Sequence, residues 1–257
     1  MSLAGKVVVI TGGGSGMGQF AARQYAQQGA KVALLDVNEA GMVETAEGHP
    51  EIHSYKVDVT DLEQMRSAID SIEADVGPIF RVMNCAAIMP FGKLLEQDPG
   101  LQAKIMDINW KGLVNISHTA LNKMLARNEG QFVSFASMAG LIPTLLTGAY
   151  SASKAAVMFY TETLHHENLA SKVQFACVCP PTVATPLLEQ ARDNWPKMLD
   201  AGGSDYLTPA DVINAVEDCL AKDSFMVFPN RDSKIGSLVR RLFPGLIWKQ
   251  VHKTEGW

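Results

Sequence analysis

The 257-residue sequence predicts an α/β fold, a doubly wound parallel sheet of seven strands with helices on both faces. Three observations support this prediction. Short runs rich in β-branched residues alternate with longer helical stretches along the chain. The short runs are almost continuously apolar, which is typical of strands buried on both faces. Hydrophobic residues make up 47% of the chain, enough to fill one large core, and no linker or repeat divides it.

The predicted strands are separated by segments long enough for a helical crossover. They span residues 6–11, 31–36, 52–58, 79–85, 131–136, 173–179 and 225–228. The helices expected between them cover residues 17–28, 39–47, 61–75, 100–127, 150–170 and 209–222. Two helix starts carry capping signals: Asp61 precedes Gln64 by three residues, and Thr208-Pro209 stands ahead of Asp211. Right-handed crossovers between these strands place helices on both faces of the sheet.

Charge is spread unevenly along the chain. There are 22 Lys and Arg residues against 27 Asp and Glu, a net charge of −5, which gives no sign of a nucleic-acid partner. Residues 231–257 carry six basic and two acidic side chains, so this tail is +4 and residues 1–230 are −9. We expect both parts to belong to one domain.

The four cysteines, Cys85, Cys177, Cys179 and Cys219, are too few for a disulfide scaffold and show no metal-ligand spacing. The N-terminus has no signal-peptide pattern, and no run reaches the roughly 18 apolar residues of a membrane span. We therefore expect a soluble, cytoplasmic protein with reduced thiols and no metal site.

A glycine-rich turn, TGGGSGMG at residues 11–18, follows the first strand and opens directly into a helix. Glycine lets the backbone approach a pyrophosphate closely, and the helix N-terminus presents free N–H groups to it. Glycine-rich turns are common, but a place between the first strand and a helix is typical of a dinucleotide-binding loop. The spacing is GxxxGxG rather than GxGxxG, which predicts a slightly longer loop.

Asp36 ends the second predicted strand, 18 residues after Gly18. A carboxylate there accepts both ribose hydroxyls of an adenosine and repels a 2′-phosphate. Ser15 and Val37, which flank the expected phosphate position, bring no positive charge. The sequence therefore favours NAD over NADP, although Asp36 is also a common turn residue.

Tyr150 and Lys154 lie in the segment YSASK, and their i, i+4 spacing puts the phenol and the ammonium on one helical face. Ser137 follows the fifth predicted strand, at the carboxyl edge of the sheet where ligands bind in this architecture. Tyr150 begins the next helix at the same edge. We therefore expect the two hydroxyls to converge.

This ordered set of motifs resembles that of the short-chain dehydrogenases/reductases of about 250 residues, which have a Rossmann fold. The match runs from the glycine loop to about residue 185. The matching elements are TGGGSGMG (11–18), Asp58-Val59, Asn84-Cys85-Ala86-Ala87, Asn109, Ser137, YSASK (150–154) and Pro180-Pro181-Thr182-Val183-Ala184-Thr185.

The resemblance implies four catalytic residues. Tyr150 is the general acid/base, Lys154 lowers the pKa of its phenol and binds the nicotinamide ribose, and Ser137 polarises the substrate oxygen. Asn109 anchors a water in a proton relay to Lys154. The cofactor-binding residues implied are Gly12, Gly14, Ser15, Gly16, Met17, Gly18, Asp36, Asp58, Val59, Asn84, Ala86, Tyr150, Lys154, Pro180, Val183 and Thr185. Residues 1–230 are then the dinucleotide-binding and catalytic part of the domain.

The sequence departs from the family pattern at two positions. Ala87 replaces a glycine where the backbone passes the cofactor. Pro181 replaces a glycine after the sixth strand, which stiffens that loop and removes one N–H donor. We expect both changes to tune the site without abolishing its function.

The loops that hold the substrate in this family are apolar here, and no Arg or Lys stands near Tyr150 to bind an anion. They comprise residues 88–91, 138–146 and 187 onward with Trp195, Met198 and Leu199. We expect a lipophilic secondary alcohol or ketone as substrate. The alternatives are an NADP-dependent ketone reductase, a sugar epimerase or dehydratase, and a catalytically idle NAD-binding scaffold.

The resemblance also implies a homotetramer or homodimer, formed through the helices at 100–127 and 150–170. The tail at 231–257 carries apolar residues between its charges, and Pro244-Gly245 splits it into two short amphipathic pieces. We expect it to contact another subunit or cover the substrate pocket. The alternative is peripheral contact with an anionic membrane.

Overall fold

The computed structural model describes residues 2–189 and 206–255. Its strands are β1 (Val7–Thr11), β2 (Lys31–Asp36), β3 (Ile52–Lys56), β4 (Ile79–Asn84), β5 (Gly130–Phe135), β6 (Val173–Val178) and β7 (Met226–Val227). The α-helices are α1 (Gly16–Gln27), α2 (Glu39–Ala46), α3 (Leu62–Asp75), α4 (Pro99–Met106), α5 (Gly112–Ile116), α6 (Asn122–Arg127), α7 (Gly148–Glu167), α8 (Pro186–Glu189), α10 (Pro209–Ala221), α11 (Arg231–Leu242) and α12 (Pro244–Glu255). Short helical turns of other types are η1 (Asp107–Lys111), η2 (Ser117–Leu121) and η3 (Met138–Gly140).

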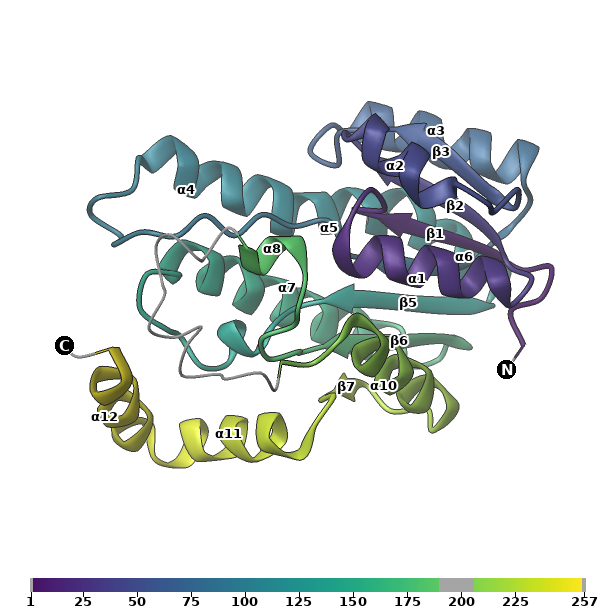
Figure 1. The fold of residues 1–257 in the computed structure, drawn as a ribbon. Helices are drawn as coiled ribbons and strands as arrows, with labels where there is room; N and C mark the ends of the chain where they lie inside the picture. The colour runs from purple at the N-terminus through teal and green to yellow at the C-terminus, as the bar shows by residue number, and fades with distance from the viewer. Residues whose placement is uncertain (1, 190–205, 256–257) are drawn as a thin grey trace.

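The seven strands form one parallel sheet, as the sequence predicted, and their order in the structure is β3-β2-β1-β4-β5-β6-β7 (Figure 1). The strand order reverses between β1 and β4, and ligands bind at the carboxyl ends of strands beside such a switch point. The predicted third strand ends two residues too late. Beyond Lys56 the Val57 N–H still bonds to the Asp36 carbonyl (3.1 Å), but the chain then turns at Asp58.

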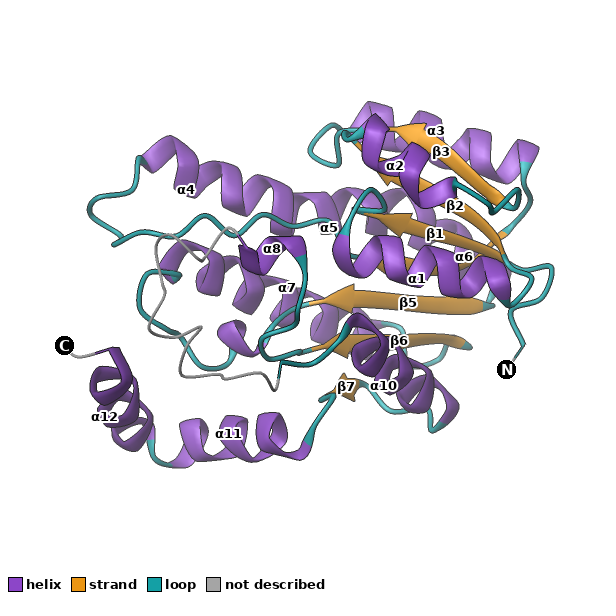
Figure 2. Ribbon diagram, in the orientation of Figure 1, coloured by secondary structure: helices purple, strands orange, loops and turns teal. Residues whose placement is uncertain are grey.

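The two faces of the sheet are covered by different helices (Figure 2). Val8 and Ile10 of β1 belong to one core cluster, together with residues of α1 and α10. Val7 and Val9 belong to the other, with residues of α3, α5 and α7. Successive side chains of a strand point to opposite faces, so a continuously apolar strand serves two cores at once.

The helix expected at 100–127 is interrupted twice by π-helical turns. These turns are η1 and η2, which separate α4, α5 and α6. π-helical turns occur often at functional sites, and η1 contains Asn109. Hydrophobic periodicity did not reveal these interruptions, since one inserted residue changes the pattern too little.

The predicted helix caps are confirmed. The Asp61 side chain accepts hydrogen bonds from the N–H groups of Glu63 and Gln64. Thr208 and Asp211 form a reciprocal capping box at the start of α10. The tail also forms two helices that meet at Pro244, as expected. In the described part of the chain no helix has the length and apolar character needed to cross a membrane.

Candidate active site

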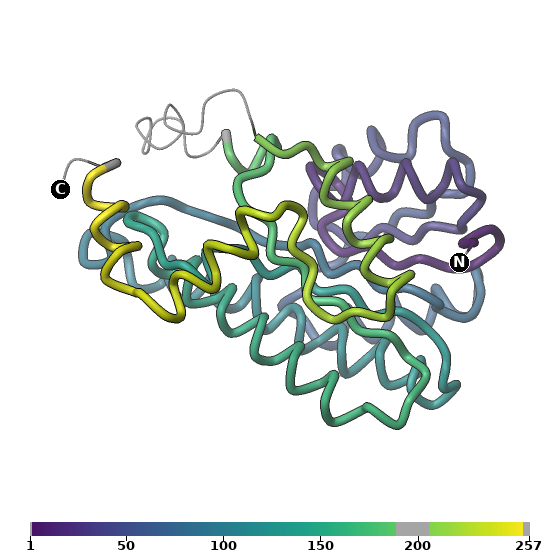
Figure 3. The backbone as a smooth tube through the Cα atoms, turned by 90° about the horizontal axis from the view of Figure 1, so that it is seen from below, coloured from purple at the N-terminus to yellow at the C-terminus, as the bar shows by residue number. Residues whose placement is uncertain are grey.

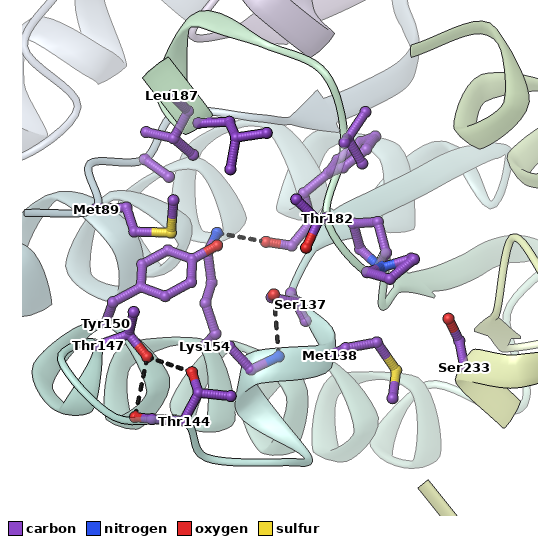
Figure 4. Close-up of a pocket in the computed structure, with 18 of the residues that line it drawn as sticks. Met89, Ser137, Met138, Thr144, Thr147, Tyr150, Lys154, Thr182, Leu187 and Ser233 are labelled. Atoms are coloured by element: carbon purple, nitrogen blue, oxygen red, sulfur yellow. Dashed lines mark hydrogen bonds between the residues drawn. The ribbon is translucent and has the colours of Figure 1, made fainter. Parts of the chain in front are cut away.

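A cavity of about 450 Å³ opens at the carboxyl ends of β4, β5 and β6 (Figure 4). Its described walls come from the turns after these strands, from α7 and from α11. The residues that line it include Met17, Cys85, Ala87, Met89, Phe91, Phe135, Ser137, Met138, Ile142, Thr144, Thr147, Tyr150, Lys154, Pro181, Thr182, Val183, Thr185, Leu187, Leu188, Asn230, Asp232, Ser233 and Gly236. Two of the three segments predicted to hold the substrate therefore lie on it, and the third does so at its start. Trp195, Met198 and Leu199 lie outside the described residues.

The glycine loop has the shape that a pyrophosphate site requires. Gly12 and Gly16 have φ values of +69° and +54°, a region that glycine enters without strain. A Cβ atom on Gly12 would lie 2.8 Å from the Ala86 backbone. Ser15, the N-cap of α1, makes no side-chain hydrogen bond, so the first N–H groups of the helix have no capping partner. These donors suit an anionic ligand.

The other predicted residues of the loop lie on either side of it. Gly14 faces β2, where a Cβ atom would approach the Asp36 Oδ2 at 3.1 Å. Met17 lines the cavity. Gly18 packs so tightly on the Gly12 carbonyl that a side chain there would collide with it. The loop is thus closed on the protein side and open toward the cavity.

Asp36 is held at the end of β2 by two backbone donors. Its Oδ2 accepts a hydrogen bond from the Gly14 N–H and its Oδ1 from the Asn38 N–H, both at 2.9 Å. A carboxylate has about four acceptor positions, so both oxygens can still accept from ribose hydroxyls. Val37 beside it is 61% exposed and uncharged.

Asp58 and Val59 are placed by the turn after β3. The Asp58 Oδ1 accepts hydrogen bonds from the Thr60 N–H (2.9 Å) and hydroxyl (2.8 Å), which is the turn-forming role. Val59 is buried, and its carbonyl accepts a hydrogen bond from the Asn115 side chain at 2.8 Å. A contact of Asp58 with the cofactor remains a prediction.

Asn84 and Ala86 connect the ends of β1 and β4. The Thr11 hydroxyl donates to the Asn84 Oδ1 (2.9 Å) and accepts from the Ala86 N–H (3.2 Å). Asn84 is buried and is not among the residues that line the cavity, so its side chain positions the loop. Ala87, the departure from the family pattern, lies on the cavity wall.

The loop after β6 is attached to the turn after β5. Its Pro180 carbonyl accepts a hydrogen bond from the Met138 N–H at 2.9 Å. Pro181, Val183 and Thr185 follow along the cavity wall. The Thr185 hydroxyl donates to the Val183 carbonyl at 3.4 Å, a long bond that leaves the hydroxyl available to a ligand.

Ser137, Tyr150 and Lys154 converge on the cavity, as the sequence predicted (Figure 4). Ser137 caps the short turn η3, and Tyr150 and Lys154 lie one turn apart on α7. The Ser137 side chain interacts with the Tyr150 phenol and lowers its pKa, and the Lys154 Nζ lies 5.7 Å from the centroid of the Tyr150 ring. Tyr150 and Lys154 are 6% and 3% exposed, so the site excludes most water.

The pKa of Tyr150 departs in the opposite direction from the expected one. Burial raises the pKa of Tyr150 to about 12, and the hydrogen bond with Ser137 opposes part of that rise. The Lys154 Nζ donates instead to the Phe135 carbonyl at 2.7 Å. Desolvation therefore decides the direction of the shift, and the phenol is protonated at neutral pH.

Lys154→Met is expected to raise the melting temperature at pH 7 by about 2–6 °C. Burial lowers the pKa of Lys154 to about 8, so the charged form costs the folded chain about 3 kcal/mol, and the unpaired Phe135 carbonyl offsets part of the gain. This cost is present below pH 8 and disappears as pH rises toward 10.5, because the folded chain loses the proton first. The stability of the parent therefore rises through this window.

Thermal unfolding of both proteins between pH 7 and 10.5 measures this effect. The difference in melting temperature should shrink across the window. Lys222→Met, which removes an exposed lysine, is the matched control and should show no such trend. A difference for Lys154→Met that stays constant with pH would contradict the assignment of the buried charge.

Asn109 lies in η1 and is 1% exposed. Its Oδ1 accepts a hydrogen bond from the Ile88 N–H (2.9 Å), and its Nδ2 donates to the Ile88 carbonyl (3.0 Å) and the Ser153 hydroxyl (2.9 Å). Ser153 in turn donates to the Tyr150 carbonyl at 2.7 Å. The side chain thus fixes the loop after β4 against the turn of α7 that carries Tyr150. The proton relay at this position remains a prediction.

Helix α11 covers part of the cavity, which is one of the two roles expected for the tail from the sequence. Asn230, Asp232, Ser233 and Gly236 line it. Figure 4 shows Ser233 on the side away from Tyr150. The Asn230 Oδ1 accepts from the Ser233 N–H (2.9 Å) and hydroxyl (2.6 Å). Asn230 is a good N-cap residue ahead of α11, but a cap says nothing about what the helix covers.

Comparisons with known proteins agree with this arrangement. A family model described as short chain dehydrogenase matches residues 6–195. Epidermal retinol dehydrogenase 2 of Mus musculus is 29% identical over 235 residues, which cover 88% of this chain and 74% of that protein. The 2-(S)-hydroxypropyl-CoM dehydrogenase 3 of Xanthobacter autotrophicus is 34% identical over 189 residues, 71% of this chain and 73% of that one. A crystal structure of a short-chain dehydrogenase/reductase from Burkholderia phymatum, in complex with NAD, has a TM-score of 0.87 and 27% identity and covers 96% of both chains.

Proposed function

This chain belongs to the short-chain dehydrogenase family, and we propose that it transfers a hydride between NAD(H) and a lipophilic secondary alcohol or ketone. The observation that carries the proposal is the convergence of Ser137, Tyr150 and Lys154 on one apolar cavity beside the glycine loop. A proton donor, a hydroxyl that binds oxygen and a cation meet there, and these are the groups that exchange of a proton with a substrate oxygen requires.

The roles of these residues follow from their positions. Ser137 holds the substrate oxygen by a hydrogen bond, and Tyr150 Oη exchanges a proton with the same oxygen. The bound cofactor would accept the hydride as NAD and supply it as NADH. A pKa of about 12 keeps Tyr150 protonated at pH 7, which suits proton donation to a ketone. Alcohol oxidation needs the phenolate, so its rate should rise with pH.

NAD is proposed over NADP because of the charge at the end of β2. The Asp36 carboxylate lies beside the position expected for the ribose hydroxyls of the adenosine half, and it would repel a 2′-phosphate. Gly12 and Gly16 have positive φ values, which lets the loop adopt the turn that a pyrophosphate-binding loop needs. The NAD named with the Burkholderia phymatum structure supports the same assignment.

Asp36→Ser is expected to raise the ratio of kcat/KM with NADP to kcat/KM with NAD by about 100-fold, or about 2.7 kcal/mol. The change removes the repulsion of the 2′-phosphate and the acceptors for the ribose hydroxyls. Steady-state rates with both cofactors measure the ratio. Glu39→Gln, which neutralises an exposed carboxylate of α2, should leave it almost unchanged. A parent protein that prefers NADP would contradict the role of Asp36.

The lipophilic substrate is proposed from the cavity wall. Met89, Met138, Ile142, Leu187 and Leu188 line it. Among the described lining residues Lys154 is the one basic side chain, and it donates to the Phe135 carbonyl, so the wall gives little support to a substrate that carries a carboxylate or phosphate. Apolar walls with few polar groups favour a substrate whose body is hydrocarbon.

A panel of alcohols and ketones with both cofactors, followed by absorbance at 340 nm, tests the function. We expect kcat/KM to rise along a series of secondary alcohols of increasing chain length. Turnover confined to small polar polyols would overturn the substrate class. A chain that binds NAD but turns over none of the panel would support the idle scaffold instead. We also propose, as separate expectations, a cytoplasmic location and a homodimer or homotetramer. Light scattering of the purified protein measures the mass of the oligomer.

A further inference from the structure

Helix α11 turns its apolar residues away from the protein. Ile235, Leu238 and Leu242 are 54%, 57% and 58% exposed, whereas Ser233 is 5% exposed. At about 100° per residue, the three apolar side chains lie about 140–180° around the helix axis from Ser233. Helices on globular proteins normally direct their apolar face toward the core. The outward orientation of this face therefore needs a partner to explain it.

The same surface continues into α12. Phe243 and Leu246 at the junction are 57% and 59% exposed, and no described side chain of α12 is buried. In Figure 1 the two helices run along the lower left of the molecule, and Figure 3, seen from below, shows them in the foreground. We call this the tail surface; its apolar members are Ile235, Leu238, Leu242, Phe243 and Leu246.

Basic side chains surround these apolar residues. They are exposed, and the ion pairs found among the described residues include none of them: Arg231, Lys234, Arg241, Lys249 and Lys253. Residues 1–230 have a net charge of −9, so the excess of basic over acidic residues is confined to this end of the chain. Exposed apolar side chains flanked by lysine and arginine are typical of helices that lie in the interface of an anionic bilayer.

We propose that α11 and α12 dock this protein on the surface of an anionic bilayer. Each helix has 12 residues, a length of about 18 Å, which is too short to cross the roughly 30 Å hydrocarbon core. The helices lie along the surface, with the five apolar side chains at the boundary of the acyl chains and the basic ones among the anionic headgroups. A two-fold contact between copies through this surface would instead bring like charges together.

Docking in this orientation also gives the cavity a position. The opposite face of α11, with Ser233 and Gly236, lines the cavity, so the bilayer and the cavity share one helix as their wall. A lipophilic substrate concentrated in the bilayer then has a short path to Tyr150. This consequence rests on the proposed function, whereas the docking itself does not.

Co-sedimentation of the full chain with vesicles tests the proposal. We expect binding to vesicles of phosphatidylcholine with about 30% phosphatidylserine, and at least about tenfold weaker binding to phosphatidylcholine alone. Leu238→Gln with Leu242→Gln should weaken binding to the anionic vesicles at least about tenfold. Lys234→Gln with Arg241→Gln should reduce the preference for anionic vesicles. Removing the whole tail is unsuitable, because α11 forms a cavity wall.

The matched control is Val43→Gln with Leu169→Gln, which changes two exposed apolar residues outside the tail surface and should leave vesicle binding unchanged. Equal loss in the control, or no binding by the parent, would overturn the proposal. The proposal would also be overturned if the parent does not bind vesicles and the Leu238→Gln/Leu242→Gln protein has a lower mass than the parent in light scattering. The tail surface would then join copies of the chain. Unchanged NAD affinity and melting temperature show that the variants fold. Absence of turnover would count against the proposed function and leave the vesicle result standing.

Discussion

Tyr150→Phe is expected to lower kcat at least about 1,000-fold and to leave the affinity for NAD within about threefold. The change removes one oxygen from a buried ring at the end of the cavity, and with it the proton that the substrate oxygen must gain or lose. The ring itself stays, so the packing with Met89 and Ile105 is kept. Turnover at 340 nm and NAD titration by calorimetry give the two quantities.

Tyr160→Phe is the control for this change. Tyr160 lies on the same helix, is half-buried and packs edge-on against Trp110 with ring centroids 6.3 Å apart. It is away from the cavity, so its loss should change kcat by less than about twofold. If Tyr150→Phe keeps more than a tenth of the parent activity, Tyr150 is not the acid/base and the proposed mechanism is wrong.

Glu217→Leu is expected to lower the free energy of unfolding by about 3–5 kcal/mol. Glu217 of α10 holds the guanidinium of Arg81 on β4, whose side chain is 1% exposed, through Nη1 to Oε1 (2.5 Å) and Nη2 to Oε2 (3.2 Å). Without Glu217 the buried charge loses its carboxylate partner and keeps its hydrogen bonds to Gln131 and its contact with the Tyr25 ring, 5.0 Å from the centroid. Urea unfolding of the purified variant measures the loss.

Arg81→Met should cost less, about 1–2 kcal/mol, because Glu217 is 32% exposed and still accepts the Tyr25 hydroxyl at 2.7 Å. Arg81→Met combined with Glu217→Leu should be more stable than Glu217→Leu alone. Asp70→Asn breaks an exposed pair with Lys123 and should change stability by less than about 1 kcal/mol. A loss in Glu217→Leu no larger than in Asp70→Asn would show that the buried pair is not a stabilising contact.

Much of the site could be predicted because its residues follow strand ends. Asp36 ends a buried strand, and Ser137 and the glycine loop follow two others. Parallel strands bring their carboxyl ends to one edge of the sheet. The spacing of Tyr150 and Lys154 places them on one helical face, and the resemblance to the short-chain dehydrogenases/reductases implied their roles. The strand runs themselves were clear because burial on both faces makes them almost continuously apolar.

Other features depend on contacts that no local pattern encodes. The side chain of Asn109 is committed to Ile88 and Ser153, which are 21 and 44 residues away in sequence. The pKa of Tyr150 is raised because tertiary packing removes water around it. Spacing shows which groups are neighbours on a helix but not how much water reaches them.

The tail shows both limits together. By itself the sequence determined that residues 231–257 are basic, apolar at intervals and divided at Pro244-Gly245 into two helical pieces. Only the tertiary structure decided which face of α11 meets the protein. Ser233 and Gly236 line the cavity, so the side chains of Leu238 and Leu242 lie on the outer face of the helix. An amphipathic pattern defines two faces of a helix, and the orientation of those faces depends on packing with distant parts of the chain.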